Sequence, residues 1–115
     1  MKQELVEKNY NILDYYGMLQ QTTIWIEELS ELIKELCKVQ RYYEKWEGDI
    51  PFMNLNNIKL ETTDVQVAID QIKKAFDYSI TQQEMDYEFK VDRTLDEIEK
   101  EKRKKEDDGW LQDVR

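Results

Sequence analysis

Scarcity of turn-forming residues is the feature that most limits how this chain can fold. Three glycines and one proline serve all 115 residues, whereas an all-β sandwich needs a turn every ~8–12 residues. Hydrophobic residues make up 40% of the chain and aromatic residues 11%, which is too apolar for a disordered acidic tail. We therefore expect an all-α fold, a bundle of about four helices within one domain.

Apolar spacing in the first half of the chain predicts two helices separated by a glycine. The first covers about residues 2–16, and Gly17 separates it from a longer helix at about residues 19–46. Residues 47–51 contain a glycine and a proline, which terminate helices. The segment 47–51 should therefore end the second helix.

The second half of the chain predicts two further helices. The Asn-rich segment 51–57 is expected to be a loop, and Asn56 or Asn57 should cap a helix at about residues 58–76. The tetrapeptide Thr81-Gln82-Gln83-Glu84 has the spacing of a capping box and should begin the fourth helix.

A charge block follows residue 99 and predicts a change in organisation there. We expect residues 1–99 to form the single helical domain and residues 100–115 to form a charged C-terminal segment. This segment would be either a frayed helix end or a tail. Trp110 and Leu111 suggest that it docks on another surface, such as a partner subunit.

Composition excludes several classes of site and partner. The chain has no histidine and one cysteine, Cys37, which removes serine–histidine catalysis, imidazole metal sites and an intramolecular disulfide. A net charge of −9 repels nucleic acid. No apolar run reaches ~18 residues, and residues 1–10 are too charged for the apolar core of a signal peptide. We expect a cytoplasmic protein that binds neither nucleic acid nor membranes.

Carboxylates interrupt the apolar face of two predicted helices. At about 100° per residue, Glu28 falls inside the apolar arc of the 19–46 helix, Glu31 lies at its edge, and Glu35 lies close by. On the 58–76 helix, Glu61 falls near the middle of the apolar stripe and Asp64 lies three residues further on, at its edge. Each of the two helices therefore carries a pair of acids, spaced i, i+3, on the face that should be buried.

Buried carboxylates need an explanation because desolvation and mutual repulsion make them costly unless they are protonated or share a cation. Oxygen donors alone suit Mg²⁺, with Mn²⁺ as a substitute, rather than zinc. A di-iron bundle would need Glu-x-x-His motifs, and the chain has no histidine. A single pair of this kind would usually be a solvated face, but two matched pairs favour a metal site.

The same residues carry a family resemblance. Glu27-Glu28-Leu29-Ser30-Glu31, followed after 29 residues by Glu61-Thr62-Thr63-Asp64, resembles the EExxE…ExxD signature of the MazG-like all-α nucleoside triphosphate pyrophosphohydrolases. The likeness spans about residues 16–98. The flanking residues that agree with it are Tyr16, Gly17, Gln20, Lys34, Lys38, Arg41, Lys90 and Arg93.

This resemblance implies an activity and an assembly. Proteins of this family are helical bundles that form a homodimer or a dimer of dimers. They hydrolyse a nucleoside triphosphate between the α and β phosphorus, which releases the monophosphate and pyrophosphate. By position, Glu28, Glu31, Glu61 and Asp64 correspond to the catalytic magnesium ligands.

Other positions of the resemblance correspond to substrate contacts. These are Gln20, Lys38, Lys90 and Arg93, although the three cations would serve equally well as surface charges. Glu27 points about 100° away from Glu28 and is expected to be solvated.

Self-association is also expected from the limited core of one chain. A bundle of this length buries only some 60–70% of its unfolded surface, and carboxylates and a cleft occupy part of the buried face. The first helix and several aromatic side chains would supply the contact surface. The aromatic residues are Tyr10, Tyr15, Tyr16, Tyr42, Tyr43 and Trp46.

A rival hypothesis from another class is a non-catalytic helical adapter. Its acidic groove would bind a basic partner, and its acids would be held at the surface. Magnesium-linked nucleotide binding is expected for the hydrolase and not for the adapter.

Overall fold

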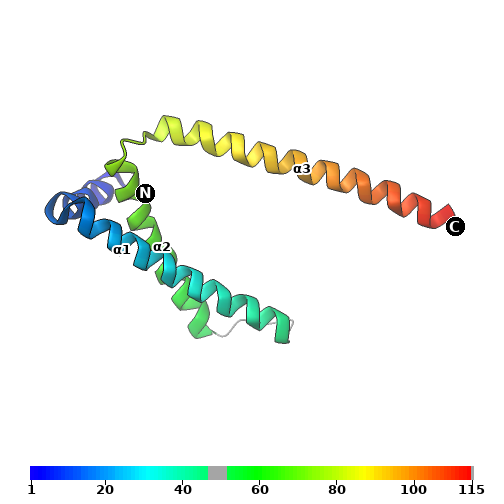
Figure 1. Cartoon of the computed structure of the whole chain (residues 1–115), viewed down its shortest axis with the longest axis horizontal. Coiled ribbons are helices and arrows are strands. Elements are labelled where there is room, and N and C mark those ends of the chain that lie inside the picture. Colours follow the sequence, from blue (N-terminus) through cyan, green and yellow to red (C-terminus); the bar gives the residue numbers. More distant parts are fainter. Residues whose placement is uncertain (47–51, 115) are drawn as a thin grey trace. The chain divides into compact units, whose positions relative to one another are not determined.

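All regular structure in the described residues, 1–46 and 52–114, is α-helical. The computed structural model contains helices α1 (Gln3–Trp46), α2 (Phe52–Ala75) and α3 (Ile80–Val114) (Figure 1). The all-α class is therefore confirmed, but the count of four separate helices is not. The predicted helix terminator at 47–51 lies outside the described residues, as do the side chains of Trp110 and Leu111. None of the described helices is long and apolar enough to cross a membrane.

The chain divides into two compact units between Asp77 and Tyr78. The first unit, Met1–Asp77, holds α1 and α2, which pack against each other. The second unit, Tyr78–Arg115, holds α3. The expected metal ligands all belong to the first unit.

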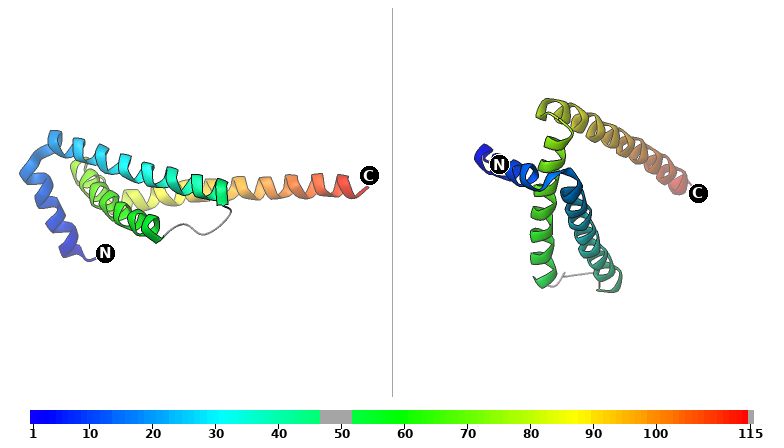
Figure 2. Two further views of the ribbon diagram at one scale, coloured as in Figure 1. Left: turned by 90° about the horizontal axis from the view of Figure 1, so that it is seen from below. Right: turned by 60° about the vertical axis from the view of Figure 1, so that its left-hand side comes forward.

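Gly17 bends α1 into two arms, residues 3–16 and residues 18–46. Its backbone has φ 83° and ψ 170°, a region of the conformational map that is essentially restricted to glycine. Because of this bend, both arms reach α2 (Figure 2): Asn9 bonds to Val67, and Trp25 bonds to Gln71. The interruption predicted at Gly17 is present, as a bend within one helix.

Helix α2 begins earlier than the sequence predicted. Residues 52–57 are helical, so the predicted loop is wrong there, and neither Asn56 nor Asn57 is a helix cap. Asparagine costs only up to ~0.7 kcal/mol inside a helix. Asn54 and Asn57 are half-buried, so this turn is in contact with the rest of the chain.

Helix α3 differs from the prediction at both ends. The Ser79 hydroxyl accepts a hydrogen bond of 3.1 Å from the backbone N–H of Gln82, so Ser79 caps the helix and the cap predicted at Thr81 is wrong. Beyond residue 99 the helix continues to Val114, so residues 100–114 are helical and belong to α3. Glu, Lys and Arg are good helix formers, and Glu99 pairs with Lys102 at 3.6 Å.

A network of buried amides joins both arms of α1 to α2. Gln71 is the centre of this network: its Oε1 accepts hydrogen bonds from Gln21 Nε2 (2.9 Å) and Trp25 Nε1 (2.8 Å). Its Nε2 donates to Asn9 Oδ1 at 2.7 Å, and Asn9 Nδ2 donates to the Val67 carbonyl at 2.9 Å. Leu13, Trp25 and Ala68 form the small apolar core. The bonds between Gln21, Trp25 and Gln71 fix how the long arm of α1 lies along α2.

The Gly17 conformation yields a stability prediction. Gly17→Ala should lower the free energy of unfolding by about 1–3 kcal/mol, because a Cβ strains this backbone conformation even though nothing lies within 4 Å of it. Urea denaturation followed by far-UV circular dichroism measures the change.

Gly109→Ala is the matched control, because Gly109 lies inside α3, also with nothing within 4 Å of an added Cβ. There alanine is the better helix former by about 0.5–1 kcal/mol, so stability should not fall. Equal stability of the Gly17→Ala variant and the unaltered chain would contradict the strained bend.

Candidate metal centre

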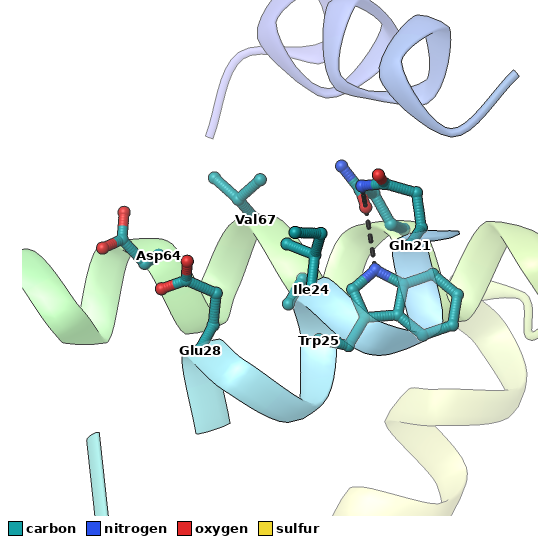
Figure 3. A pocket seen from close by; sticks show the side chains of 8 residues that line it. Gln21, Ile24, Trp25, Glu28, Asp64 and Val67 are labelled. Atoms are coloured by element: carbon teal, nitrogen blue, oxygen red, sulfur yellow. Dashed lines mark hydrogen bonds between the residues drawn. The ribbon is translucent and has the colours of Figure 1, made fainter. Parts of the chain in front are cut away.

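Three carboxylates from two helices converge in the first unit. Glu28 projects from the long arm of α1, and Glu61 and Asp64 project from α2. One oxygen of each lies within 4.8 Å of the others, and Figure 3 shows the Glu28 and Asp64 carboxylates pointing toward each other. The two helices run antiparallel, since Gln21 faces Gln71 while Glu28 meets Asp64.

Burial and mutual repulsion perturb this cluster. The pKa of Glu28 is raised, first by removal from water and then by the negative charges of Asp64 and Glu61. The pKa of Glu61 is also raised, by removal from water and by the charges of Asp64, Glu31 and Glu35. Both shifts mean that the folded chain disfavours full ionisation of the cluster.

The donor set fits a hard divalent cation. In the described part of the chain, the ion pairs join Lys38 to Glu35 and Lys102 to Glu99, so neither neutralises the cluster. Glu61 Oε2 is buried and has no hydrogen-bond partner. Carboxylate oxygens with excess negative charge are the ligands that Mg²⁺ and Mn²⁺ prefer.

The structure brings together three of the four predicted ligands. Glu31, the fourth, is exposed and lies outside the group that converges within 4.8 Å. It is nevertheless close enough for its charge to raise the pKa of Glu61. Glu31 thus acts on Glu61 through its charge without converging with the three carboxylates.

Glu35 is a buried acid that the sequence analysis placed nearby but did not assign. Only 7% of Glu35 is exposed, and its Oε1 forms an ion pair with Lys38 Nζ at 3.0 Å. Its position seven residues after Glu28 places it on the same face of the helix, which indicates that it lies near Glu28 but does not determine its burial.

The predicted substrate contacts have different surroundings. Lys38 is half-buried and is held by Glu35, and Gln20 is exposed on α1. Lys90 and Arg93 are exposed on α3, in the second unit, where the Arg93 guanidinium lies 5.9 Å from the centre of the Phe89 ring. Of these four predicted contacts, Lys38 lies next to Glu35, whose negative charge raises the pKa of Glu61 in the cluster.

A cavity of about 110 Å³ opens beside the carboxylates (Figure 3). Gln21 is buried in its wall, while its neighbour Gln20, the residue chosen from the sequence, is exposed. The position of Gln21 seven residues before Glu28 could have indicated this. The lining side chains are Gln21, Ile24, Trp25, Glu28, Asp64, Val67, Ala68 and Gln71.

Comparison with known proteins provides no relative: no family model, no curated protein and no solved structure matches the chain.

The raised pKa values predict how stability depends on pH. Just above the ordinary glutamate value of 4.5, the folded chain binds more protons at Glu28 and Glu61 than the unfolded chain does. The contribution of these groups to stability therefore falls as pH rises through that window. In cation-free protein, Glu28→Gln and Glu61→Gln should each reduce this loss. Urea unfolding midpoints measured between about pH 5 and neutrality test the effect.

Glu44→Gln, an exposed change on the same helix as Glu28, is the control and should leave the pH dependence unaltered. Identical pH profiles for all three variants would contradict a carboxylate cluster strained by its own charge.

Proposed function

We propose that this chain is a divalent-cation-dependent hydrolase that cleaves a nucleoside or deoxynucleoside triphosphate into the monophosphate and pyrophosphate. The observation that carries the proposal is the convergence of Glu28, Glu61 and Asp64 without a neutralising cation from the protein. The convergence of like charges from two helices costs free energy because they repel one another, and a bound cation would offset that cost. The EExxE…ExxD resemblance names the reaction class.

Glu28, Glu61 and Asp64 would hold the cation, with Glu31 at their exposed side. A divalent cation bound there would supply Lewis acidity toward a phosphoryl oxygen and make water more acidic. The chain's own part is to hold the carboxylates close together in a fixed arrangement. The packed helices and the Gln71 network supply that fixation.

The remaining residues would act on the substrate. Ile24 and Trp25 line the cavity beside Glu28 and give it apolar surface. Lys38 would contact the triphosphate after leaving Glu35. We propose Gln20, Lys90 and Arg93 as further contacts. The cation, Lys38, Lys90 and Arg93 would make the local potential positive at the triphosphate, although the net charge of the chain is −9.

Homo-oligomerisation is the second part of the proposal. Large apolar side chains of the first unit remain open to water, including Tyr15 (81% exposed), Leu19 (88%) and Ile33 (60%). A single chain buries few apolar residues in that unit. Removing such side chains from water contributes about 1.5–3 kcal/mol each, so a second copy would stabilise the fold.

The catalytic prediction concerns Glu61→Gln, which preserves size but removes one negative charge from the cluster. Turnover should fall at least 10–100-fold, the range found for disturbed metal sites, while helical circular dichroism is retained. Separation of the products formed from each (d)NTP, with and without Mg²⁺, is the measurement. Glu44→Gln again serves as the control.

Three results would count against the hydrolase: undiminished turnover of Glu61→Gln, release of orthophosphate instead of pyrophosphate, and calorimetry without magnesium-linked nucleotide binding. The last result is the one expected of an acidic adapter.

The assembly prediction follows from the exposed apolar side chains. The thermal midpoint should rise with protein concentration, because association stabilises only the folded state. Light scattering should give a mass of two or four chains of 14.1 kDa. A fully active monomer at micromolar concentration would refute the assembly and leave the metal site unaffected.

A further inference from the structure

A cavity of about 200 Å³ lies between the first arm of α1, residues 3–16, and α2. None of the three converging carboxylates lines it. Asp70, which does line it, comes six residues after Asp64, or about 120° further around the helix. The cavity is therefore separate from the candidate metal centre. Its lining includes Leu5, Val6, Asn9, Thr63, Gln66, Val67 and Asp70.

Asp70 supplies a buried carboxylate to this cavity. Only 9% of the residue is exposed. Its Oδ1 accepts a hydrogen bond of 3.1 Å from Gln66 Nε2, whereas its Oδ2 accepts none from residues 1–46 and 52–114. A buried carboxylate is costly unless a positive charge compensates it.

The lysines that follow Asp70 on α2 do not compensate its charge. Lys74 lies four residues further on, the spacing at which ion pairs form on a helix, but its ammonium lies 5.2 Å from the centre of the Tyr10 ring. Lys73, three residues after Asp70, forms no ion pair with any of the residues that the structure describes. The charge of Asp70 is thus available to a bound cation.

The free hydrogen-bonding capacity of the cavity lies on oxygen atoms. The amide nitrogens of Asn9 and Gln66 already donate within the chain, and so does the Thr63 hydroxyl. Asp70 Oδ2 and Gln66 Oε1 accept no hydrogen bond from the described residues. A primary ammonium group, which has three N–H donors and no acceptor, complements these oxygens.

The remaining wall of the cavity is apolar. Leu5 is 52% exposed and Val67 is 40% exposed, and both line the cavity together with Val6. At about 30 Å³ for each non-hydrogen atom, the volume that one molecule occupies in liquid water, about 200 Å³ holds about seven such atoms. The cavity therefore has room for a short carbon chain as well as a charged group.

We propose that this cavity binds a small aliphatic primary amine, with its ammonium on Asp70 and its carbon chain against Leu5, Val6 and Val67. One carboxylate compensates one positive charge, and the apolar wall favours an organic cation over a hydrated metal ion. The amine would contact α1 and α2 together and so stabilise the first unit. This site goes beyond the proposed function and does not depend on it.

The test is a titration of the full chain with n-butylamine, which like lysine is an ammonium ion at neutral pH, followed by two-dimensional NMR. n-Butanol has the same carbon chain without the charge, and ammonium chloride has the charge without the chain. Each should bind at least about 10-fold more weakly than n-butylamine, because each lacks one of the two interactions.

Asp70→Asn removes the charge and preserves the shape of the side chain. It should weaken n-butylamine binding by about 10–100-fold, the loss expected for one charged hydrogen bond. Asp14→Asn, an exposed change on α1, is the matched control and should leave binding unaltered. Circular dichroism confirms that both variants are folded.

Two further variants test the position of the amine. Leu5→Ala should weaken n-butylamine binding more than Leu60→Ala does, because Leu60 is similarly exposed (57%) but does not line the cavity. Glu61→Gln should bind n-butylamine as the unaltered chain does, since Glu61 belongs to the carboxylate cluster.

Equal binding of n-butanol and n-butylamine, or equal binding of n-butylamine by Asp70→Asn and Asp14→Asn, would overturn the amine site. Loss of n-butylamine binding in Glu61→Gln would locate the amine at the carboxylate cluster and would also overturn it. The first two results would leave the proposed hydrolase standing, because neither Asp70 nor Asp14 belongs to its cluster.

Discussion

The side-chain amide of Gln71 joins α2 to both arms of α1, and the packing of the first unit depends on these hydrogen bonds. It accepts from Gln21 and Trp25 on the long arm of α1 and donates to Asn9 on the other arm. Buried hydrogen bonds of this kind contribute about 0.5–1.5 kcal/mol each, but leaving their groups unpaired costs about 1–3 kcal/mol. The network therefore acts mainly by excluding other alignments of the helices, because each of them would strand several buried polar groups.

Beyond the amide network, α1 and α2 also carry a repulsive interaction that destabilises their packing. Past Gln21 and Trp25, the facing positions are occupied by Glu28 and Asp64, which repel. Stabilising amide bonds and destabilising carboxylates thus share one interface, and the rigidity of the first keeps the second in place. An interface in which hydrogen-bonded amides hold repelling carboxylates together is expected where a ligand neutralises those carboxylates.

Features that depend on local chemistry could be predicted from the sequence, whereas features set by packing could not. The bend at Gly17 follows from backbone freedom, and the positions of Glu28 and Asp64 on or beside the apolar faces of their two helices follow from helical periodicity. The burial of Glu35 could not be predicted in this way, since acids near an apolar arc are either buried or solvated according to what faces them.

The helix boundaries show the same distinction. Local propensity predicts Asn57 in a loop, but Asn57 is half-buried and helical in the structure. The charge block after residue 99 was expected to end the last helix, but residues 100–105 are good helix formers and the helix continues through them. Ser79 and Gln82 also have the spacing of a capping box, and the hydrogen bond forms there rather than at the predicted Thr81.

The hydrogen bonds around Gln71 also bear on how this chain folds. They join residues separated by 46, 50 and 62 positions, which is a long range for a helical protein, in which most contacts are local. Each loop must close before its bond forms, and closure entropy grows with loop length. The helices themselves form in about a microsecond, so docking of α2 onto both arms of α1 should limit the folding rate. A small helical protein with this topology is expected to fold more slowly than its helix content suggests.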